Sequence, residues 1–556
     1  MSAAGITAPG DEPKGMMQKM LDGIEKAGNK VPHPVMMFVY LIAIVMILSV
    51  VLDVLNVGVT EEILVPADQV SSGQEYVGGS SIPIDVTTPG WEDDYVMQEV
   101  RVDVRSLFNV DGLRFLFTSF VSNFGNFSVV PVIFVAMIGV GVAEEAGLMA
   151  ALIRRLVSVA PGSILTFAIV LIGGLSSVAT DAGYLILIPL GAAAFLSVGR
   201  HPLAGVAAAF AGVSAAFSVN ILIAPVDALI TEMTNESIRI VDPNGSITIT
   251  ANLYFSVVST ILMAIVITLV TSRIIEPRLG KYMPVADESD EAVAEEPAKG
   301  LTPEAEAKGL RWALFGFLGA LIGIVLMTAP SGAPLRDPIS GGIIGTTPFM
   351  DSLIFMISLI FLIAGLGFGY GSGTFTNSTQ VITGVTKTFA GLSGLIFMLL
   401  IISQFIAYFN YTNMPNVIAG GLAHLLERAN VNEVVLLVGF ILVICLLDII
   451  IPGVLPKWAI FAPIFVPLFM RLGVAPQTVL AAYRIGDSPM NVITPLMVYL
   501  PFIVIVAQRY EKKAGIGTII SLMIPYTLIV LVVWTTIFVL WYLFGIPLGP
   551  GYPVDF

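Results

Sequence analysis

The stretch that decides the fold runs from Leu447 to Pro501 and reads LDIIIPGVLPKWAIFAPIFVPLFMRLGVAPQTVLAAYRIGDSPMNVITPLMVYLP. It is almost entirely apolar, yet it contains the charged residues Asp448, Lys457, Arg484 and Asp487. A charged side chain at the bilayer centre costs roughly 2.5–3.5 kcal/mol on insertion scales, so these groups need partners or a function. Prolines and glycines also interrupt this stretch, and broken backbone at membrane depth survives only inside protein or beside a cavity. We therefore predict half of a transport site, built from a hairpin followed by an interrupted helix.

Composition places the chain among all-α polytopic membrane proteins. Of its 556 residues, 56% are hydrophobic and only 12% are charged, and apolar runs of membrane-spanning length recur along it. The net charge of −14 argues against a nucleic acid partner. The single cysteine, Cys445, rules out a disulfide framework. The three histidines lie far apart and outside any zinc-binding pattern, so we expect no cofactor other than a bound Na⁺.

The apolar runs predict spans at 35–52, 129–143 (continuing to Arg155), 252–270, 312–329, 349–367, 389–408 and 519–543. Lysines before the first span favour a cytoplasmic N-terminus, the acid-rich loop at 58–111 suits the outer face, and an odd number of crossings leaves the C-terminus outside. The predicted parts are a cytoplasmic N-terminal tail (1–34), a first transmembrane half (35–272) with one repeat at 162–230, an acidic cytoplasmic linker (273–310), a second half (311–545) with the other repeat at 436–504, and a C-terminal tail (546–556).

An internal repeat links the two halves. Shifting residues 186–214 by 274 positions superimposes nine identical residues without a gap. The helix breakers carry the comparison: Pro189, Gly199, Pro202 and Gly212 fall on Pro463, Gly473, Pro476 and Gly486. Interrupted segments at matching places in two halves mark the binding site of a secondary transporter. An odd number of crossings between the copies would make the repeats inverted.

In the second repeat, Arg484 and Asp487 are three residues apart, so while the segment is helical they share a face and can pair. Lys457 can compensate either Asp448 or Asp487. A buried structural ion pair is one reading of this group. The other reading is a site where Asp448, Asp487, Ser488 and Asn491 hold Na⁺ or relay protons, with Thr494 extending the polar face towards Pro495. Trp458 either stacks on an aromatic substrate or packs against another helix.

The first repeat offers a polar hairpin tip with Ser176, Ser177, Thr180 and Asp181, and Asn220 lies beyond its interrupted helix. One acid among hydroxyl groups is typical of a site for a cation or a polar substrate. The alternative is that these side chains serve only the packing of the hairpin.

These residues carry a resemblance to a known family. The stretches SSVATDAGYLILIPL, GRHPLAGVAAAFAGVS, QFIAYFNYTN, KWAIFAPIFVPLF and YRIGDSPMNVITPLMVYLP resemble the p-aminobenzoyl-glutamate transporter (AbgT) family, in order and over nearly the whole chain. The resemblance implies a homodimer whose protomers have nine transmembrane helices and two re-entrant hairpins. It also implies ion-coupled transport of p-aminobenzoyl-glutamate or related folate-pathway compounds, with export of sulfonamide antimetabolites by some members. The functional positions of the family fall on Asp181, Trp458, Pro476, Arg484, Asp487 and Pro495.

The second hairpin tip departs from the family pattern. Asp448 stands where family members usually have asparagine, and Gly453 and Leu455 replace two hydroxyl side chains. Unpaired buried polar groups cost about 1–3 kcal/mol each, so the loss of two hydroxyl partners should change which polar substrate groups are accepted. The natural substrate is therefore the inference that the resemblance supports least.

We predict a secondary active transporter of the cell inner (plasma) membrane that works by alternating access. A cation at Asp448 and Asp487 would bias the hairpin, Asp181 would serve the related site, and Arg484, Lys457 and Trp458 would contact a small anionic aromatic substrate. A dicarboxylate carrier of the same architecture is the first alternative. An intramembrane enzyme is disfavoured because the chain lacks a nucleophile paired with a base, and a passive channel is disfavoured because two gated half-sites indicate occlusion.

Overall fold

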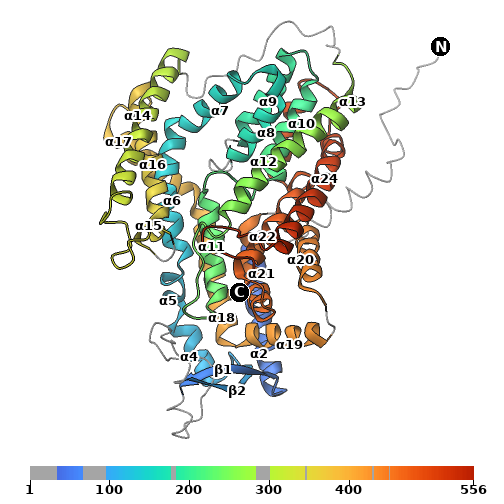
Figure 1. Cartoon of the computed structure of the whole chain (residues 1–556). Helices are drawn as coiled ribbons and strands as arrows, with labels where there is room; N and C mark the ends of the chain where they lie inside the picture. The colour runs from blue at the N-terminus through green and yellow to red at the C-terminus, as the bar shows by residue number, and fades with distance from the viewer. Residues whose placement is uncertain are drawn as a thin grey trace, which may run out of the picture.

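The computed structural model describes residues 34–66, 95–176, 183–282, 301–344, 347–428, 431–449, 451 and 453–555. Within these ranges the named elements are helices apart from one antiparallel ribbon of two strands, β1 (Gly58–Pro66) and β2 (Tyr95–Asp103). The ribbon lies with α4 at one end of the molecule, and α13 lies at the opposite end (Figure 1). Composition predicted only a polar loop at 58–111, so the ribbon is an addition to the expected all-α fold.

The helices of the first half are α2 (Pro34–Val54), α4 (Val110–Thr118), α5 (Phe120–Gly125), α6 (Val129–Ala146), α7 (Leu148–Ser158), α8 (Leu165–Leu175), α9 (Ile188–Ser197), α10 (Pro202–Phe210), α11 (Pro225–Ile238), α12 (Leu253–Val270) and α13 (Glu276–Leu279). Those of the second half are α14 (Pro303–Thr328), α15 (Pro348–Asp351), α16 (Leu353–Ser372), α17 (Ser378–Gly391), α18 (Ser393–Tyr411), α19 (Met414–Arg428), α20 (Glu433–Asp448), α21 (Val454–Arg471), α22 (Pro476–Asp487), α23 (Leu500–Gln508) and α24 (Ile516–Leu543).

Eight helical segments in the described ranges are long and apolar enough to cross a membrane. They are α2, Phe120–Ala146, Leu253–Leu279, α14, α16, α18, α21 and α24. The pair α7 and α8, which is bent by 110° at a short break, would make a ninth span if counted as one. The chain is therefore a multi-pass membrane protein, in agreement with the predicted fold class of about nine spans.

Two predicted boundaries need correction. The helix that starts at Val129 does not continue to Arg155, because Gly147 adopts a left-handed φ of 91° and separates α6 from α7. Helix also enters both ends of the predicted linker, since α13 ends at Leu279 and α14 begins at Pro303. The acidic run at 283–300 and residues 1–33 of the N-terminal tail lie outside the described residues.

Helix ends follow the internal repeat. α9 ends at Ser197 and α21 at Arg471, while α10 begins at Pro202 and α22 at Pro476, so both boundaries recur after 274 residues. Between them, Gly199 and Gly473 both have a left-handed φ, at 73° and 83°. A glycine after the helix end and a proline at the first helical position form a stop and a start signal, which explains why equivalent residues set equivalent ends.

The two interrupted helices form the buried centre of the molecule. All residues of α10 and α22 are buried. α8 packs against a π-helical turn at Ala211–Ala215, and α20 packs against α22. Small residues permit the first contact, because a Cβ on Gly212 would lie 2.8 Å from the carbonyl oxygen of Val170. Backbones at this spacing leave no room for a larger residue.

Replacing Gly212 by alanine should therefore lower the apparent melting temperature of the detergent-solubilised protein. Overpacking of a tight contact typically costs about 1–3 kcal/mol. Gly319 on α14 provides the matched control, because no atom lies within 4 Å of the position its Cβ would take. Gly319→Ala should leave the melting temperature unchanged or raise it slightly. An equal response of the two variants would contradict the close contact between α8 and the π-helical turn.

Candidate functional site

Both repeats lose regular helix at the predicted places. After α10, the chain passes through the π-helical turn at Ala211–Ala215 and runs irregularly until α11 begins at Pro225. After α22, it forms a short 3-10 turn, Pro489–Val492, and stays irregular until α23. Proline lacks the amide hydrogen that a continuing helix needs, which accounts for the interruption at Pro489. The first interruption has no proline and follows the π-helical turn instead. The breaks expected near Gly212 and Gly486 are confirmed.

The ammonium group of Lys457 lies between two carboxylates. It contacts Asp448 and is 2.7 Å from Oδ1 of Asp487, and all three side chains are fully buried. Asp448 ends α20, Lys457 lies in the first turns of α21, and Asp487 ends α22, so three elements converge here. Lys457 thus compensates both aspartates rather than one of them. Removing one partner of such a buried group leaves an uncompensated charge.

Hydroxyl groups from both repeats lie next to Asp487, although that of Tyr483 donates its proton to the carbonyl oxygen of Val454 at 2.6 Å. The Ser218 hydroxyl donates to Oδ2 at 3.1 Å, and the Tyr483 hydroxyl lies 3.3 Å from Oδ1. Ser218 belongs to the interrupted segment of the first repeat, which therefore touches the interrupted helix of the second. In Asp448, by contrast, Oδ2 is buried and has no hydrogen-bond partner among the residues that the structure describes.

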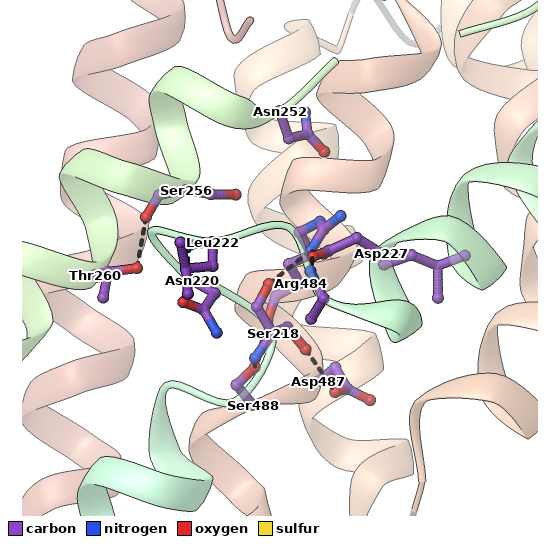
Figure 2. A network of polar contacts seen from close by, with 12 residues as sticks. Ser218, Asn220, Leu222, Asp227, Asn252, Ser256, Thr260, Arg484, Asp487 and Ser488 are labelled. Carbon is purple, nitrogen blue, oxygen red and sulfur yellow. Dashed lines mark hydrogen bonds and ion pairs between the residues drawn. The ribbon is translucent and has the colours of Figure 1, made fainter. Parts of the chain in front are cut away.

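Arg484 does not form the ion pair with Asp487 that the sequence spacing allows. Nη1 of Arg484 donates instead to Oδ1 of Asp227 at 2.5 Å and to the carbonyl oxygen of Ser218 at 2.7 Å. Figure 2 shows Ser218 between Arg484 and Asp487. A spacing of three residues would allow this pair on a helix, but Asp227 and the carbonyl oxygen of Ser218 already accept from Arg484. Lys457 takes the position next to Asp487.

Asp227 was missed by the sequence analysis, although it anchors this arginine. Its Oδ2 accepts from the amide of Ala224 at 2.7 Å and caps the start of α11, which leaves Oδ1 for Arg484. The signal that could have revealed it is the one applied to the second repeat: an acid in an apolar stretch next to an interruption.

Trp458 is packed within the protein. Its ring lies 4.3 Å from that of Tyr483, and its indole N–H is 3.0 Å from the hydroxyl of Thr234 and 3.2 Å from the carbonyl oxygen of Ile230. Trp458 is fully buried against α11 and α22 in this arrangement. Its contact with a substrate stays a prediction.

The other second-repeat candidates surround the break. Ser488 donates to the carbonyl oxygen of Arg484 at 2.9 Å and accepts from the amide of Ser218 at 3.1 Å. Thr494 donates to the carbonyl oxygen of Ile449, which ties the irregular segment to the hairpin tip. The remaining three are Asn491, which is buried in the 3-10 turn, Pro476, which begins α22, and Pro495, which lies in the irregular segment.

First-repeat candidates hold the hairpin arm. Ser176 donates to the carbonyl oxygen of Gly173 at 2.6 Å. Asn220 donates to the carbonyl oxygen of Gly174 at 3.1 Å and accepts from the amide of Leu222, so it fixes the irregular segment against α8. The other residues predicted for this tip, Ser177, Thr180 and Asp181, lie outside the described residues.

The positions of the carboxylates and of Lys457 limit how Na⁺ can bind at this site. In the part of the chain that the structure describes, no group of three or more His, Cys, Asp or Glu side chains is arranged to hold a metal ion. The ammonium group of Lys457 occupies the space between Asp448 and Asp487. A cation that bound both carboxylates would have to displace Lys457, whereas the unpartnered Oδ2 of Asp448 can accept a proton without this rearrangement.

Comparison of the sequence with known proteins identifies the family. A model of the AbgT transporter family matches residues 19–556. The p-aminobenzoyl-glutamate transport protein of Escherichia coli strain K12 is 33% identical over 536 residues, which are 96% of this chain and 97% of that protein.

Two solved structures have the same fold. The YdaH transporter of Alcanivorax borkumensis, described as having an unusual topology, matches with a TM-score of 0.81 and 36% identity over 93% of this chain and 100% of its own. MtrF of Neisseria gonorrhoeae, described as illuminating a class of antimetabolite efflux pumps, matches with a TM-score of 0.83 and 35% identity over 96% of this chain and 100% of its own.

Replacing Lys457 by methionine should strongly destabilise the protein, by about 3–5 kcal/mol, because two buried carboxylates lose the cation they share. Adding Asp448→Asn should recover part of this loss. The measurement is unfolding of the solubilised protein in a denaturing detergent. Lys387→Met is the control, since Lys387 is 69% exposed and its pair with Glu145 contributes little. A Lys457→Met protein as stable as the unmodified one would contradict the shared ion pair.

A double-mutant cycle tests the corrected pairing of Arg484. Residues in direct contact show coupling energies of about 0.5–3 kcal/mol, so Arg484→Gln and Asp227→Asn should be coupled within this range. The cycle of Arg484→Gln with Asp487→Asn should give a smaller value, because those side chains meet only through Ser218. A larger coupling energy for Arg484 with Asp487 than for Arg484 with Asp227 would contradict the contacts seen in the structure.

Proposed function

Because the chain belongs to the AbgT transporter family, we propose that it is an ion-coupled secondary transporter of p-aminobenzoyl-glutamate or a related folate-pathway aromatic carboxylate. Its working place is the cell inner (plasma) membrane, with the N-terminus in the cytoplasm and the C-terminus outside. The functional unit is a homodimer.

The charge balance of the site carries the proposal of ion coupling. Three carboxylates, from Asp227, Asp448 and Asp487, face two cationic groups, from Lys457 and Arg484, so the fully ionised cluster has one net negative charge. These five side chains are at most 14% exposed. An uncompensated buried charge is costly, and binding one H⁺ or Na⁺ neutralises it. The ion therefore has a reason to bind, and its binding changes the electrostatics where the hairpin meets both interrupted helices.

Arg484 and its aromatic neighbours support an anionic aromatic substrate. Nη1 of Arg484 already has two acceptors, but its Nε is buried without a hydrogen-bond partner in the described part of the chain. A guanidinium group has five N–H donors in a planar fork that suits a carboxylate. Tyr483 precedes Arg484 in α22 and its ring lies 4.3 Å from that of Trp458, so the two rings would offer a surface to a benzoyl group once the hairpin opens.

Interrupted helices give the transporter its moving parts. Irregular backbone near Ser218 and Ser488 joins the two repeats, and short half-helices on either side can rock about these joints. Alternating access then exposes the cluster first to one side of the membrane and then to the other. Export of sulfonamide antimetabolites is a second activity of this machinery, favoured by the efflux pump with which the chain shares 35% of its residues.

Counterflow in proteoliposomes tests the coupling. Asp487→Asn should reduce gradient-driven uptake of p-aminobenzoyl-glutamate at least tenfold, because the cluster loses the charge that attracts the coupling ion. Asp448→Asn also removes one negative charge, here from the carboxylate with an unpartnered oxygen. Transport should persist in this variant, but its rate should depend less on the ion gradient. Asp111→Asn, at a side chain that is 75% exposed, is the control and should behave like the unmodified protein.

The assay is run with a Na⁺ gradient, with a pH gradient and with neither. Gradient-driven uptake that survives Asp487→Asn unchanged would reject ion coupling at this cluster. Citrate and succinate are included as competitors. If either displaces p-aminobenzoyl-glutamate, the protein is the dicarboxylate carrier considered above.

A further inference from the structure

The end of the chain folds back against the helix that carries Arg484 and Asp487. We call residues 545–555, which follow α24, the C-terminal strap. Figure 1 shows the end of the chain beside α21 and α22, in the middle of the molecule. Leu548 and Val554 of the strap are 0% and 2% exposed.

The strap is bonded to the start of α22. Three pairs join them: Nε2 of Gln477 with the carbonyl oxygen of Pro553 at 2.6 Å, Oγ1 of Thr478 with that of Val554 at 2.5 Å, and Val474 with Asp555 in an antiparallel bridge. Gln477 is 4% exposed and Thr478 is fully buried. The strap thus supplies the acceptors for two buried donors in the first turn of α22, and this turn would lose both hydrogen bonds without it.

The same strap is bonded to the segment around the start of α12. The amide of Phe255 donates to the carbonyl oxygen of Leu548 at 3.1 Å, and the amide of Thr248 donates to the hydroxyl of Tyr552 at 2.7 Å. Asn252 completes the junction by donating from Nδ2 to the carbonyl oxygen of Gln477 at 2.8 Å. The strap therefore links α22 to a neighbouring span.

The first repeat anchors its equivalent helix in a different way. Arg200, just before α10, makes two contacts with Glu276 at 2.7 and 2.9 Å, and Nδ1 of His201 accepts from the amide of Leu203. The 274-residue shift places Val474 at the position of Arg200 and Ala475 at that of His201. Neither side chain can form an ion pair or cap a helix. The second repeat has lost both anchors, and the strap supplies contacts at the same place.

We propose that the C-terminal strap is a positioning element for Arg484 and Asp487. Gln477 and Arg484 are seven residues apart, so they lie on the same face of α22, about two turns from one another. Fixing the first turn of this helix fixes where the guanidinium group and the carboxylate stand at its other end. The contacts of the strap do not depend on the proposed function; only the roles of Arg484 and Asp487 in transport rest on it.

Cys445 provides a native probe of this arrangement. It is the only cysteine of the chain, it is 1% exposed, and it lies on α20. α20 packs tightly on α22, because a Cβ on Gly486 would lie 2.7 Å from Cβ of Ile444. A thiol in this interface reacts with N-ethylmaleimide only when α20 and α22 separate.

The test compares the alkylation rate of Cys445 in the solubilised full-length protein with the rate in four variants of it. A chain that ends at Phe544 should react about tenfold faster, which corresponds to about 1.4 kcal/mol of interface stability. Thr478→Val, which loses one donor, should react severalfold faster, and Thr478→Ser, which keeps the hydroxyl, should react at the unmodified rate. Thr536→Val is the control, because Thr536 is exposed on α24 and bonds only within its own helix.

A second measurement separates positioning from general loosening. In proteoliposomes, Thr478→Val should raise KM for p-aminobenzoyl-glutamate severalfold with little change in kcat, and Thr478→Ser should restore it. Unchanged alkylation in Thr478→Val overturns the proposal, and so does faster alkylation with an unchanged KM. If the shortened chain does not fold, the two Thr478 variants decide alone. Alkylation needs no substrate, so a failure of the proposed function leaves that result intact.

Discussion

The contact of one buried lysine with two aspartates is the constraint on which the rest of the structure depends. Asp448, Lys457 and Asp487 are fully buried in a protein that is otherwise apolar at this depth. No single helix can bring these groups together, so the ends of α20 and α22 and the start of α21 must converge. A hairpin tip and an interrupted helix are the means of this convergence, because they place helix ends inside the protein, where broken backbone is tolerated at membrane depth.

Convergence of the two repeats follows from the same requirement. Ser218 lies in the irregular segment of the first repeat, and it donates to Asp487 while its carbonyl oxygen accepts from Arg484. Broken backbone thus supplies polar atoms where polar side chains need partners, and the side chains in turn satisfy the backbone. Each repeat thus supplies hydrogen-bond partners for polar groups at the interruption of the other. We propose that ion binding controls motion at this joint, since one additional charge changes the balance of the whole cluster.

The two repeats share helix ends but not chemistry. Equivalent glycines and prolines begin and end α9, α10, α21 and α22, whereas the charged cluster belongs mainly to the second repeat and is completed by Asp227 from the first. Anchoring differs in the same way, with Arg200 and Glu276 in one repeat and the C-terminal strap in the other. Backbone architecture was thus kept across the repeats while side chains diverged, which is consistent with a single asymmetric site served by two related scaffolds.

Composition and helix breakers by themselves determined that this chain spans a membrane many times, where its helices are interrupted, and that Lys457 stands near acids. These features are local, because apolar length, proline and glycine act on the segment that contains them. The β-ribbon at Gly58–Asp103 escaped this reading, since strands in a polar loop have no apolar run to mark them. Only the tertiary structure decided that Arg484 binds Asp227 rather than Asp487. Arg484 and Asp227 are 257 positions apart, and the contact of Lys457 with Asp487 outweighed the favourable spacing of Arg484 and Asp487 in the sequence.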